Sequence, residues 1–294
     1  MNPFGLTVGN RLAEQLVPRL LTPAFAFWAG GLLALWTPAR GHRWSERIGA
    51  LSGVEQVALL AAAVSLIAGS AVVAELLTLP VLRLLEGYGP LTRAPRRFQR
   101  RRYEDADAQL QALSGRAFRG EPVDPLRLAA AEQRLHDFPG VDRIMPTRLG
   151  NILRAAEDRP AERYGLDPVI CWPHLWLALD KDVQLELTEA RRSLDDAARL
   201  WLWFLLFSAW TWTAWWAPLV SVAGCVVTYH AAMLGRARAY GQLLQAAFDL
   251  HRHLIYAALR WPVPESPDRE RAGGEAVTTY LWRGIAPPGM RFTS

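Results

Sequence analysis

Glu75 is the residue whose type and position are most suited to chemistry. It lies inside the apolar block Val57–Leu85, which reads VALLAAAVSLIAGSAVVAELLTLPVLRLL. A carboxylate within a membrane helix is costly, and such groups serve ion pathways, proton relays or interhelical pairs. Pro80 and Arg83 follow closely, so a side chain that reaches the cytoplasmic interface and pairs there is the alternative. The sequence leaves both roles open.

A second polar group is expected near the inner end of a later apolar stretch. Thr228 and His230 could line a pore or form hydrogen bonds with a neighbouring helix, and helix packing is the more common role of such groups. Farther on, His251 and His253 are two residues apart and would face different directions on a helix. The sequence therefore predicts no metal site and no cofactor.

Recognised catalytic motifs are absent from the sequence. It has no phosphate-binding glycine loop, no GxSxG and no HExxH. Cys171 and His174 have a spacing that suits one helical face, but Pro173 is expected to break that helix. An enzyme is disfavoured. The enzymatic alternative is a membrane-bound catalyst acting on a lipid-linked substrate, with Asp167 or Glu157 as the acid or base.

The basic groups are almost all arginines, and the only lysine is Lys181. Their densest cluster follows the block that holds Glu75. The chain has a net charge of +5, but its arginines gather beside apolar blocks, which favours membrane topology over nucleic-acid binding. Near an anionic membrane each basic group contributes about 1 kcal/mol of attraction. The predicted ligands of lipid headgroups are Arg93, Arg96, Arg97, Arg100, Arg101 and Arg102.

The Trp-rich stretch Arg199–Arg238 is the strongest membrane signal. From Leu200 to Leu234 it contains no Lys, Arg, Asp or Glu. About 35 helical residues would span roughly 52 Å, too long for one crossing of a bilayer core. A turn at Ala217-Pro218 would divide the stretch into a transmembrane hairpin. Tryptophans near both ends of a short span are typical of interfacial anchors, although an aromatic ligand cage is conceivable. The predicted anchors are Trp201, Trp203, Trp212, Trp215 and Trp216.

An earlier pair of apolar blocks predicts another hairpin. Leu20–Thr37 is just long enough to cross a bilayer, and the second helix is the block that holds Glu75. Gly30-Gly31 offers a flat patch for the close approach of another helix. In the second helix, small residues also suggest helix packing; they are Ala62, Ser65, Gly69 and Ala71.

Arginine asymmetry predicts the orientation. The cluster that begins at Arg93 and the arginines that flank the Trp-rich hairpin place these segments in the cytoplasm by the positive-inside rule. Arg40, Arg43 and Arg47 would then lie outside, against the rule, but they are outnumbered. We therefore expect a multi-pass protein of the cytoplasmic (inner) membrane with both termini in the cytoplasm.

The fold class expected is an all-α integral membrane protein. It has four transmembrane helices in two hairpins, a helical cytoplasmic insert and an amphipathic C-terminal helix. Within the insert, Tyr164–Leu179 is too broken to span a membrane and is expected to form the core of the insert or to lie along the interface. The predicted segments are 1–19, amphipathic; 20–85, first hairpin; 86–198, insert; 199–235, second hairpin; and 236–294, a helix at Ala237–Trp261 and a loop-like tail.

The stretch MPTRLGNILRAAEDRPAERYGLDPVICWPHLW, the Trp-rich hairpin and AAFDLHRHLIYAALRWP resemble a family of bacterial membrane proteins without an assigned function. This resemblance covers roughly Met145–Gly284 and implies no activity. The layout is also similar to that of the bestrophin type of oligomeric anion channel, without that family's sequence motifs.

The leading functional hypothesis is a non-enzymatic, oligomeric membrane protein that acts as a channel or as a membrane-anchored sensor or effector. Its expected partners are membrane lipids and either further copies of the chain or a membrane complex. A scaffold subunit of a larger complex is a further alternative.

Overall fold

A computed structural model describes residues 22–33, 35, 47, 49–89 and 93–292. Every regular element in this part of the chain is helical, which confirms the all-α prediction. The predicted amphipathic segment 1–19 lies outside the described residues. The chain forms two compact units: unit 1 comprises the described residues up to Leu82 together with Asp195–Met233, and unit 2 comprises Arg83–Leu194 and Leu234–Ser294.

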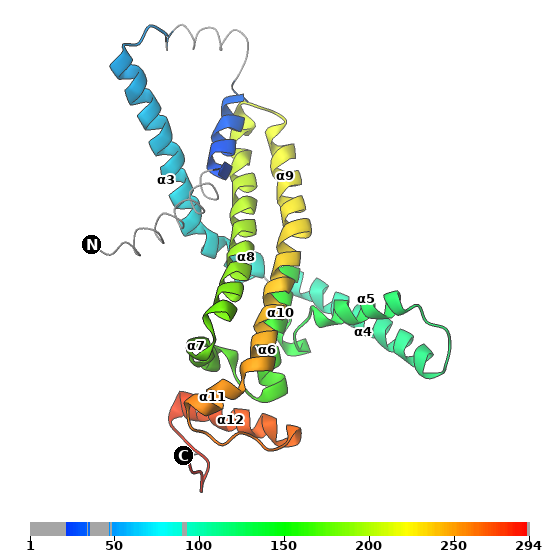
Figure 1. Cartoon of the computed structure of the whole chain (residues 1–294). Coiled ribbons are helices and arrows are strands. Elements are labelled where there is room, and N and C mark those ends of the chain that lie inside the picture. The colour runs from blue at the N-terminus through cyan, green and yellow to red at the C-terminus, as the bar shows by residue number, and fades with distance from the viewer. Residues whose placement is uncertain (1–21, 34, 36–46, 48, 90–92, 293–294) are drawn as a thin grey trace, which may run out of the picture. The chain divides into compact units, whose positions relative to one another are not determined.

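The described part of the chain contains the helix Thr22–Leu33 and ten labelled α-helices (Figure 1). These are α3 (Gly53–Glu86), α4 (Arg93–Phe118), α5 (Pro125–His136), α6 (Arg148–Tyr164), α7 (Pro168–Ala178), α8 (Lys181–Phe207), α9 (Ala217–Val227), α10 (Leu234–His251), α11 (His253–Ala258) and α12 (Pro267–Arg283). Val141–Arg143 and Ser208–Trp212 are 3₁₀ turns, and Thr228–Met233 is π-helical.

Two described helices are long and apolar enough to cross a membrane. They are α3 and the continuous helical run Ala217–His251, with 34 and 35 residues. Within the structure, 11% of the apolar window of α3 and 28% of that of the second helix are buried. The core helix of a soluble protein would be mostly buried, so the low burial supports membrane association. Thr22–Leu33 is apolar but shorter, and α8 carries charged residues from its start to Arg199.

Unit 1 is held together by a small apolar cluster. Its buried members are Ala24, Ala71, Ala74, Leu202 and Trp203, contributed by Thr22–Leu33, α3 and α8. The flat patch predicted at Gly30-Gly31 is covered by aromatic side chains: a Cβ on Gly31 would lie 2.0 Å from a ring atom of Trp210. Of the small residues predicted to pack on α3, Ala71 is buried, whereas a Cβ on Gly69 would meet nothing within 4 Å.

The Trp-rich hairpin turns earlier than predicted. The turn lies at 213–216, between the 3₁₀ segment and α9, and Pro218 falls in the first turn of α9 instead of in the loop. Proline is tolerated there because the N–H that it lacks has no partner in a first helical turn. In unit 1, another proline, Pro80, lies inside a helix, because α3 continues through it to Glu86.

Unit 2 has an apolar core of its own. The helix α6 packs against α10 and α12, and α7 packs against α11 and α12. Leu166, Cys171, Leu175, Phe248 and Val277 are all fully buried in the main cluster. This places one face of the stretch 164–179 in the core, as expected.

Local sequence explains where the helices of unit 2 begin and end. Thr147 and Asp167 cap the N-termini of α6 and α7 by accepting backbone N–H groups. Gly165 ends α6 in the left-handed conformation, with a φ of 69°. Close by, α12 crosses α6 so tightly that a Cβ on Gly274 would lie 1.9 Å from the carbonyl oxygen of Tyr164. A side chain at either glycine would disrupt this junction.

Three local predictions for unit 2 are wrong. Pro173 lies inside α7 and does not break it, although the helix loses the hydrogen bond that residue 173 would donate. The expected helix Ala237–Trp261 is interrupted at Arg252, between α10 and α11. The tail contains α12, a 17-residue helix with Pro267 in its first turn.

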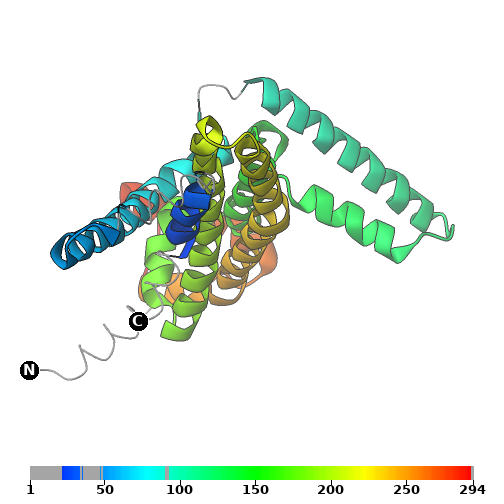
Figure 2. The same ribbon diagram turned by 90° about the horizontal axis from the view of Figure 1, so that it is seen from above.

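Figures 1 and 2 also show α4 and α5 side by side, joined by a short connection.

Candidate functional site

Glu75 forms an ion pair within unit 1. The Arg199 guanidinium contacts its carboxylate and also lies 2.7 Å from a carboxylate oxygen of Asp196, one turn earlier on α8. The Arg199 side chain is 8% exposed, whereas that of Glu75 is 49% exposed. The arginine is therefore the buried member, and the two carboxylates together satisfy its charge.

This pair identifies the partner that the sequence did not assign to Glu75. Arg199 is the last charge before the uncharged run that begins at Leu200. One acid in an apolar helix and one base at the edge of another is a pattern that could have suggested the pair. Among the roles that the sequence leaves open for Glu75, the contact with Arg199 favours the interhelical pair.

Thr228 and His230 both lie in the π-helical segment Thr228–Met233, but they differ in environment. Thr228 is buried, whereas His230 is exposed and makes an edge-on contact with Tyr229 at 5.1 Å. A π-helical turn widens the helix locally and is frequent at functional positions. Within a single chain, Thr228 and His230 therefore do not line a common pore or cavity.

Arginines of α4 surround a shallow hollow of about 370 Å³ in unit 2. Arg96, Arg97 and Arg100 line it together with Asp142. Arg96 also donates to the carbonyl oxygen of Ile144 at 2.7 Å, which fixes α4 to the 3₁₀ turn. Three arginines and one aspartate thus line the hollow, and Arg100 also lies 3.4 Å from a carboxylate oxygen of Glu104.

The other members of the arginine cluster have different surroundings. Arg101 is exposed, and Arg102 lies 5.9 Å from the centre of the Phe98 ring. Arg93 begins α4, but its side chain lies outside the described part. The headgroup role of these arginines stays a prediction.

The predicted anchor tryptophans fall into two groups. Trp212 and Trp215 are 96% and 81% exposed at the turn of the hairpin. Trp203 is buried in the cluster of unit 1, and Trp201 and Trp216 are half-buried. Because the exposure of these five tryptophans differs, Trp212 and Trp215 fit interfacial anchors better than the buried Trp203 does.

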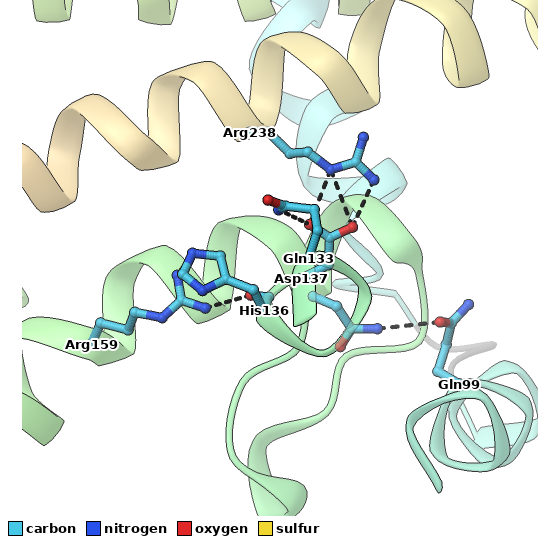
Figure 3. A network of polar contacts seen from close by, with 7 residues as sticks. Gln99, Gln133, His136, Asp137, Arg159 and Arg238 are labelled. Carbon is cyan, nitrogen blue, oxygen red and sulfur yellow. Dashed lines mark hydrogen bonds and ion pairs between the residues drawn. The ribbon is translucent and has the colours of Figure 1, made fainter. Parts of the chain in front are cut away.

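A polar network joins α4, α5, α6 and α10 in unit 2, and Figure 3 shows most of its members. Arg238 donates to both carboxylate oxygens of Asp137, over 2.6–3.1 Å. Gln133 also donates to Asp137, at 3.3 Å. On the other side of the network, the buried Asn151 donates to Gln99 at 3.3 Å and accepts the backbone N–H of residue 145 at 2.6 Å.

His136 in this network is an acceptor. The Arg159 guanidinium lies 2.6 Å from its Nε2 and also contacts its carbonyl oxygen. Burial and the neighbouring Arg159 lower the pKa of His136. The ring is thus neutral and engaged, and the adjoining cavities are small, about 60 and 20 Å³. The network is suited to fixing helices and offers no room for a substrate.

The acid and base of the enzymatic alternative have structural partners. Asp167 accepts the backbone N–H of Val169 at 2.8 Å as the cap of α7. Glu157 lies 3.7 Å from Arg154. Neither Asp167 nor Glu157 lines the arginine hollow of α4, the small cavities beside the polar network or the groove between α7 and α8. Cys171 is fully buried, and burial raises the pKa of its thiol to about 11. Over the described ranges, no group of three or more His, Cys, Asp and Glu could hold a metal ion.

Comparisons with protein-family models, with curated proteins and with solved structures found no match to this chain.

Proposed function

We propose that this chain is a multi-pass membrane protein that acts without catalysis, as a membrane-anchored sensor or effector with a helical cytoplasmic domain. Unit 1 would be the membrane part, with four spans in two hairpins. Unit 2 would be the cytoplasmic part, and both termini would lie in the cytoplasm of the cell.

The observation that carries this proposal is the exposure of apolar helix surface in unit 1. On α3, Val54, Leu60 and Leu76 are between 65% and 80% exposed, and little of that helix is buried within the chain. Water would penalise this surface at about 25 cal/mol per Å², whereas lipid tails or another apolar helix would accept it. Unit 2, in contrast, buries its own core.

An oligomeric channel is the other version of the same proposal. It is supported by the open face of α3 around Gly69, where another helix could approach closely, and by the polar groups of the π-helical segment. The ion pair of Glu75 with Arg199 favours the sensor or effector, because it removes the most obvious charge from a conduction path.

Fractionation of cells that express the chain tests the membrane location. We expect the protein to remain with the membrane after washing with alkaline carbonate and to require detergent for release. Release by carbonate would contradict the proposal. Maleimide labelling of single cysteines at Ser52, Thr213 and Ser266 then tests the orientation: only Ser266→Cys should be protected from an impermeant reagent in intact cells.

The oligomeric state separates the two versions. A monomer in detergent that gives no ion flux in liposomes would exclude the channel, whereas a closed oligomer with ion flux would exclude the sensor or effector as the main role.

A further inference from the structure

A groove of about 540 Å³ lies on the surface of unit 2 between α7, α8 and α10. Its volume falls within the roughly 300–1,000 Å³ typical of sites for small molecules. All of the residues that line it belong to this unit: Trp172, Pro173, Trp176, Leu177, Leu187, Thr188, Arg191, Arg192 and Tyr240.

The apolar wall of the groove is supported from behind. Trp172 and Trp176 are one turn apart on α7, with ring centres 5.6 Å from each other, and Trp172 also packs on the fully buried Phe248. Gln184 on α8 donates to the carbonyl oxygen of Trp176 at 2.6 Å and so ties the two helices together. The wall is held in place by the core.

The outer surface of α7 is apolar and uncovered. Leu177 lines the groove and is 84% exposed, and Val169, two turns earlier, is exposed to the same degree. Exposed apolar side chains beside a ligand-sized groove mark an interaction site more often than a plain surface.

The charges in the groove are all positive. Arg191 lies 5.6 Å from the centre of the Tyr240 ring, and no acidic side chain lines the groove. Arg192 is exposed, and among the described residues no hydrogen bond or ion pair engages its guanidinium. Arg191 follows Leu187 by one turn of α8 and Arg192 follows Thr188 by one turn, so the cationic part of the groove adjoins the apolar part. This combination fits a molecule with an anionic head and an apolar tail.

The position of the arginines along α8 indicates a lipid as the source of that molecule. Arg192 precedes the uncharged run that begins at Leu200 by eight residues of one helix, roughly 12 Å along its axis. If that run enters the hydrocarbon, the arginine comes within side-chain reach of the headgroups. This step rests on the proposed membrane location.

We propose that the groove binds one anionic phospholipid, with an acyl chain against Trp176 and Leu177 and its phosphate at Arg192. The lipid would cover the exposed surface of α7 and would couple the cytoplasmic unit to the composition of the bilayer. A cluster of arginines near a membrane surface attracts anionic headgroups electrostatically, and the groove adds selection for a chain.

Photo-crosslinking to the purified full-length protein tests this proposal. The probe is phosphatidylglycerol with a diazirine in its acyl chain, presented in neutral detergent micelles, and labelled peptides are identified by mass spectrometry. We expect label on the peptide that contains Trp172–Leu177, and at least fivefold less from the phosphatidylcholine probe. Inorganic phosphate should not compete, because it cannot fill the apolar part.

Two variants and two matched controls locate the site. Arg192→Gln and Leu177→Asp should each reduce the labelling of that peptide at least fivefold. Arg127→Gln removes an exposed arginine of α5, and Leu185→Asp changes an exposed leucine of α8 outside the groove; both should label like the wild type. All four positions are exposed, and equal far-ultraviolet circular dichroism would show that the fold is kept.

The outcomes separate this inference from the proposed function. Equal labelling by both probes, or full labelling of Arg192→Gln, would contradict the contact between the lipid phosphate and Arg192. Label confined to other peptides would contradict binding of the acyl chain in the groove. If the groove is not labelled but the protein resists carbonate extraction, this inference fails alone. If carbonate releases the protein but the groove is still labelled, the membrane location fails and the site stands.

Discussion

The two units of this chain place their apolar side chains in opposite ways. In unit 1, α3 leaves large aliphatic residues such as Leu60 and Leu76 exposed, and its buried residues are Ala71, Ala74, Thr78 and Leu82. In unit 2, Leu175, Phe248 and Ile255 are almost completely enclosed by neighbouring helices of the same chain. Unit 2 is thus organised around a core of its own, whereas the exposed apolar surface of α3 in unit 1 supports membrane association.

The charged groups differ in the same way. Unit 1 has one conspicuous pair at its helices, between Glu75 and Arg199, whereas unit 2 has a network in which amides, a neutral histidine and several arginines are joined.

The largest effect is expected for Arg199→Leu. In an apolar environment it leaves the Glu75 carboxylate without a counter-charge, which costs about 3–5 kcal/mol, whereas replacement of both members costs little. If water surrounds the pair, the loss is only about 1 kcal/mol. Unfolding of the protein in bilayers or mild micelles distinguishes these cases.

Glu75→Leu combined with Arg199→Leu is the matched double variant and should recover most of the lost stability. Arg83→Leu, at an exposed position on α3, is the control for loss of one positive charge. If the single and double variants have the same free energy of unfolding, Glu75 and Arg199 are not energetically coupled. The ion pair would then not support the contrast between the two units.

Gly274→Ala tests how tightly unit 2 is packed. The new methyl group would meet the Tyr164 carbonyl oxygen at 1.9 Å, and because backbone cannot move aside cheaply, we expect a loss of about 2–3 kcal/mol. Gly69→Ala in α3 is the control, since its Cβ meets nothing and helix propensity improves by up to about 1 kcal/mol. Chemical denaturation measures both.

A neutral result for Gly274→Ala would mean that α12 does not cross α6 as closely as described. A destabilising Gly69→Ala would instead indicate that another copy of the chain packs on α3, which would favour the oligomeric version of the proposed function.

The alkaline stability of unit 2 should depend on Cys171. Burial raises the pKa of this thiol from 9.0 to about 11, so the unfolded state loses its proton first as pH rises. Unfolding then becomes easier between pH 9 and 11, by about 1.4 kcal/mol for each unit of pKa shift at most. Below pH 9 the thiol is neutral in both states and contributes no pH dependence.

Denaturation curves recorded at pH 8 and pH 11 measure this effect. Cys171→Ala should show a shallower loss of stability than the wild type. Burial also raises the pKa of Tyr256, to about 12, so part of the alkaline loss remains in this variant. A wild-type slope in Cys171→Ala would show that its thiol is not protected by the fold.

The sequence predicts helices well where local signals act alone. Asp124 caps α5, with Pro125 in its first turn, and Thr147 caps α6, so both helix starts are specified by local sequence. The close contact at Gly30-Gly31 also follows from residue size. The helix that contains Pro173 was harder to predict: α7 continues through this proline with one backbone hydrogen bond fewer, and the sequence does not show that the helix continues.

The candidate sites could be predicted only as residue types. Glu75 was identified as unusual, but its partner Arg199 lies 124 positions away in sequence, and only packing of the helices brings them together. The groove between α7 and α8 was missed for the same reason. Its tryptophans belonged to a stretch expected to be core or interface, and Leu187, Arg191 and Tyr240 come from other elements.

The smallest effect is expected for Trp212→Ala, at the turn of the hairpin. Its side chain is 96% exposed and makes little contact within the chain, so the free energy of unfolding in micelles should change by less than about 0.5 kcal/mol. Trp203→Ala in the same hairpin should cost about 3–5 kcal/mol, because Trp203 fills the cluster of unit 1. If Trp212 is an anchor, its fluorescence should be quenched by lipids brominated near the headgroup, and the difference signal between wild type and Trp212→Ala isolates that contribution. Quenching by aqueous iodide without quenching by the lipids would place the turn in water, and the exposed tryptophans of unit 1 would then need an explanation other than the membrane.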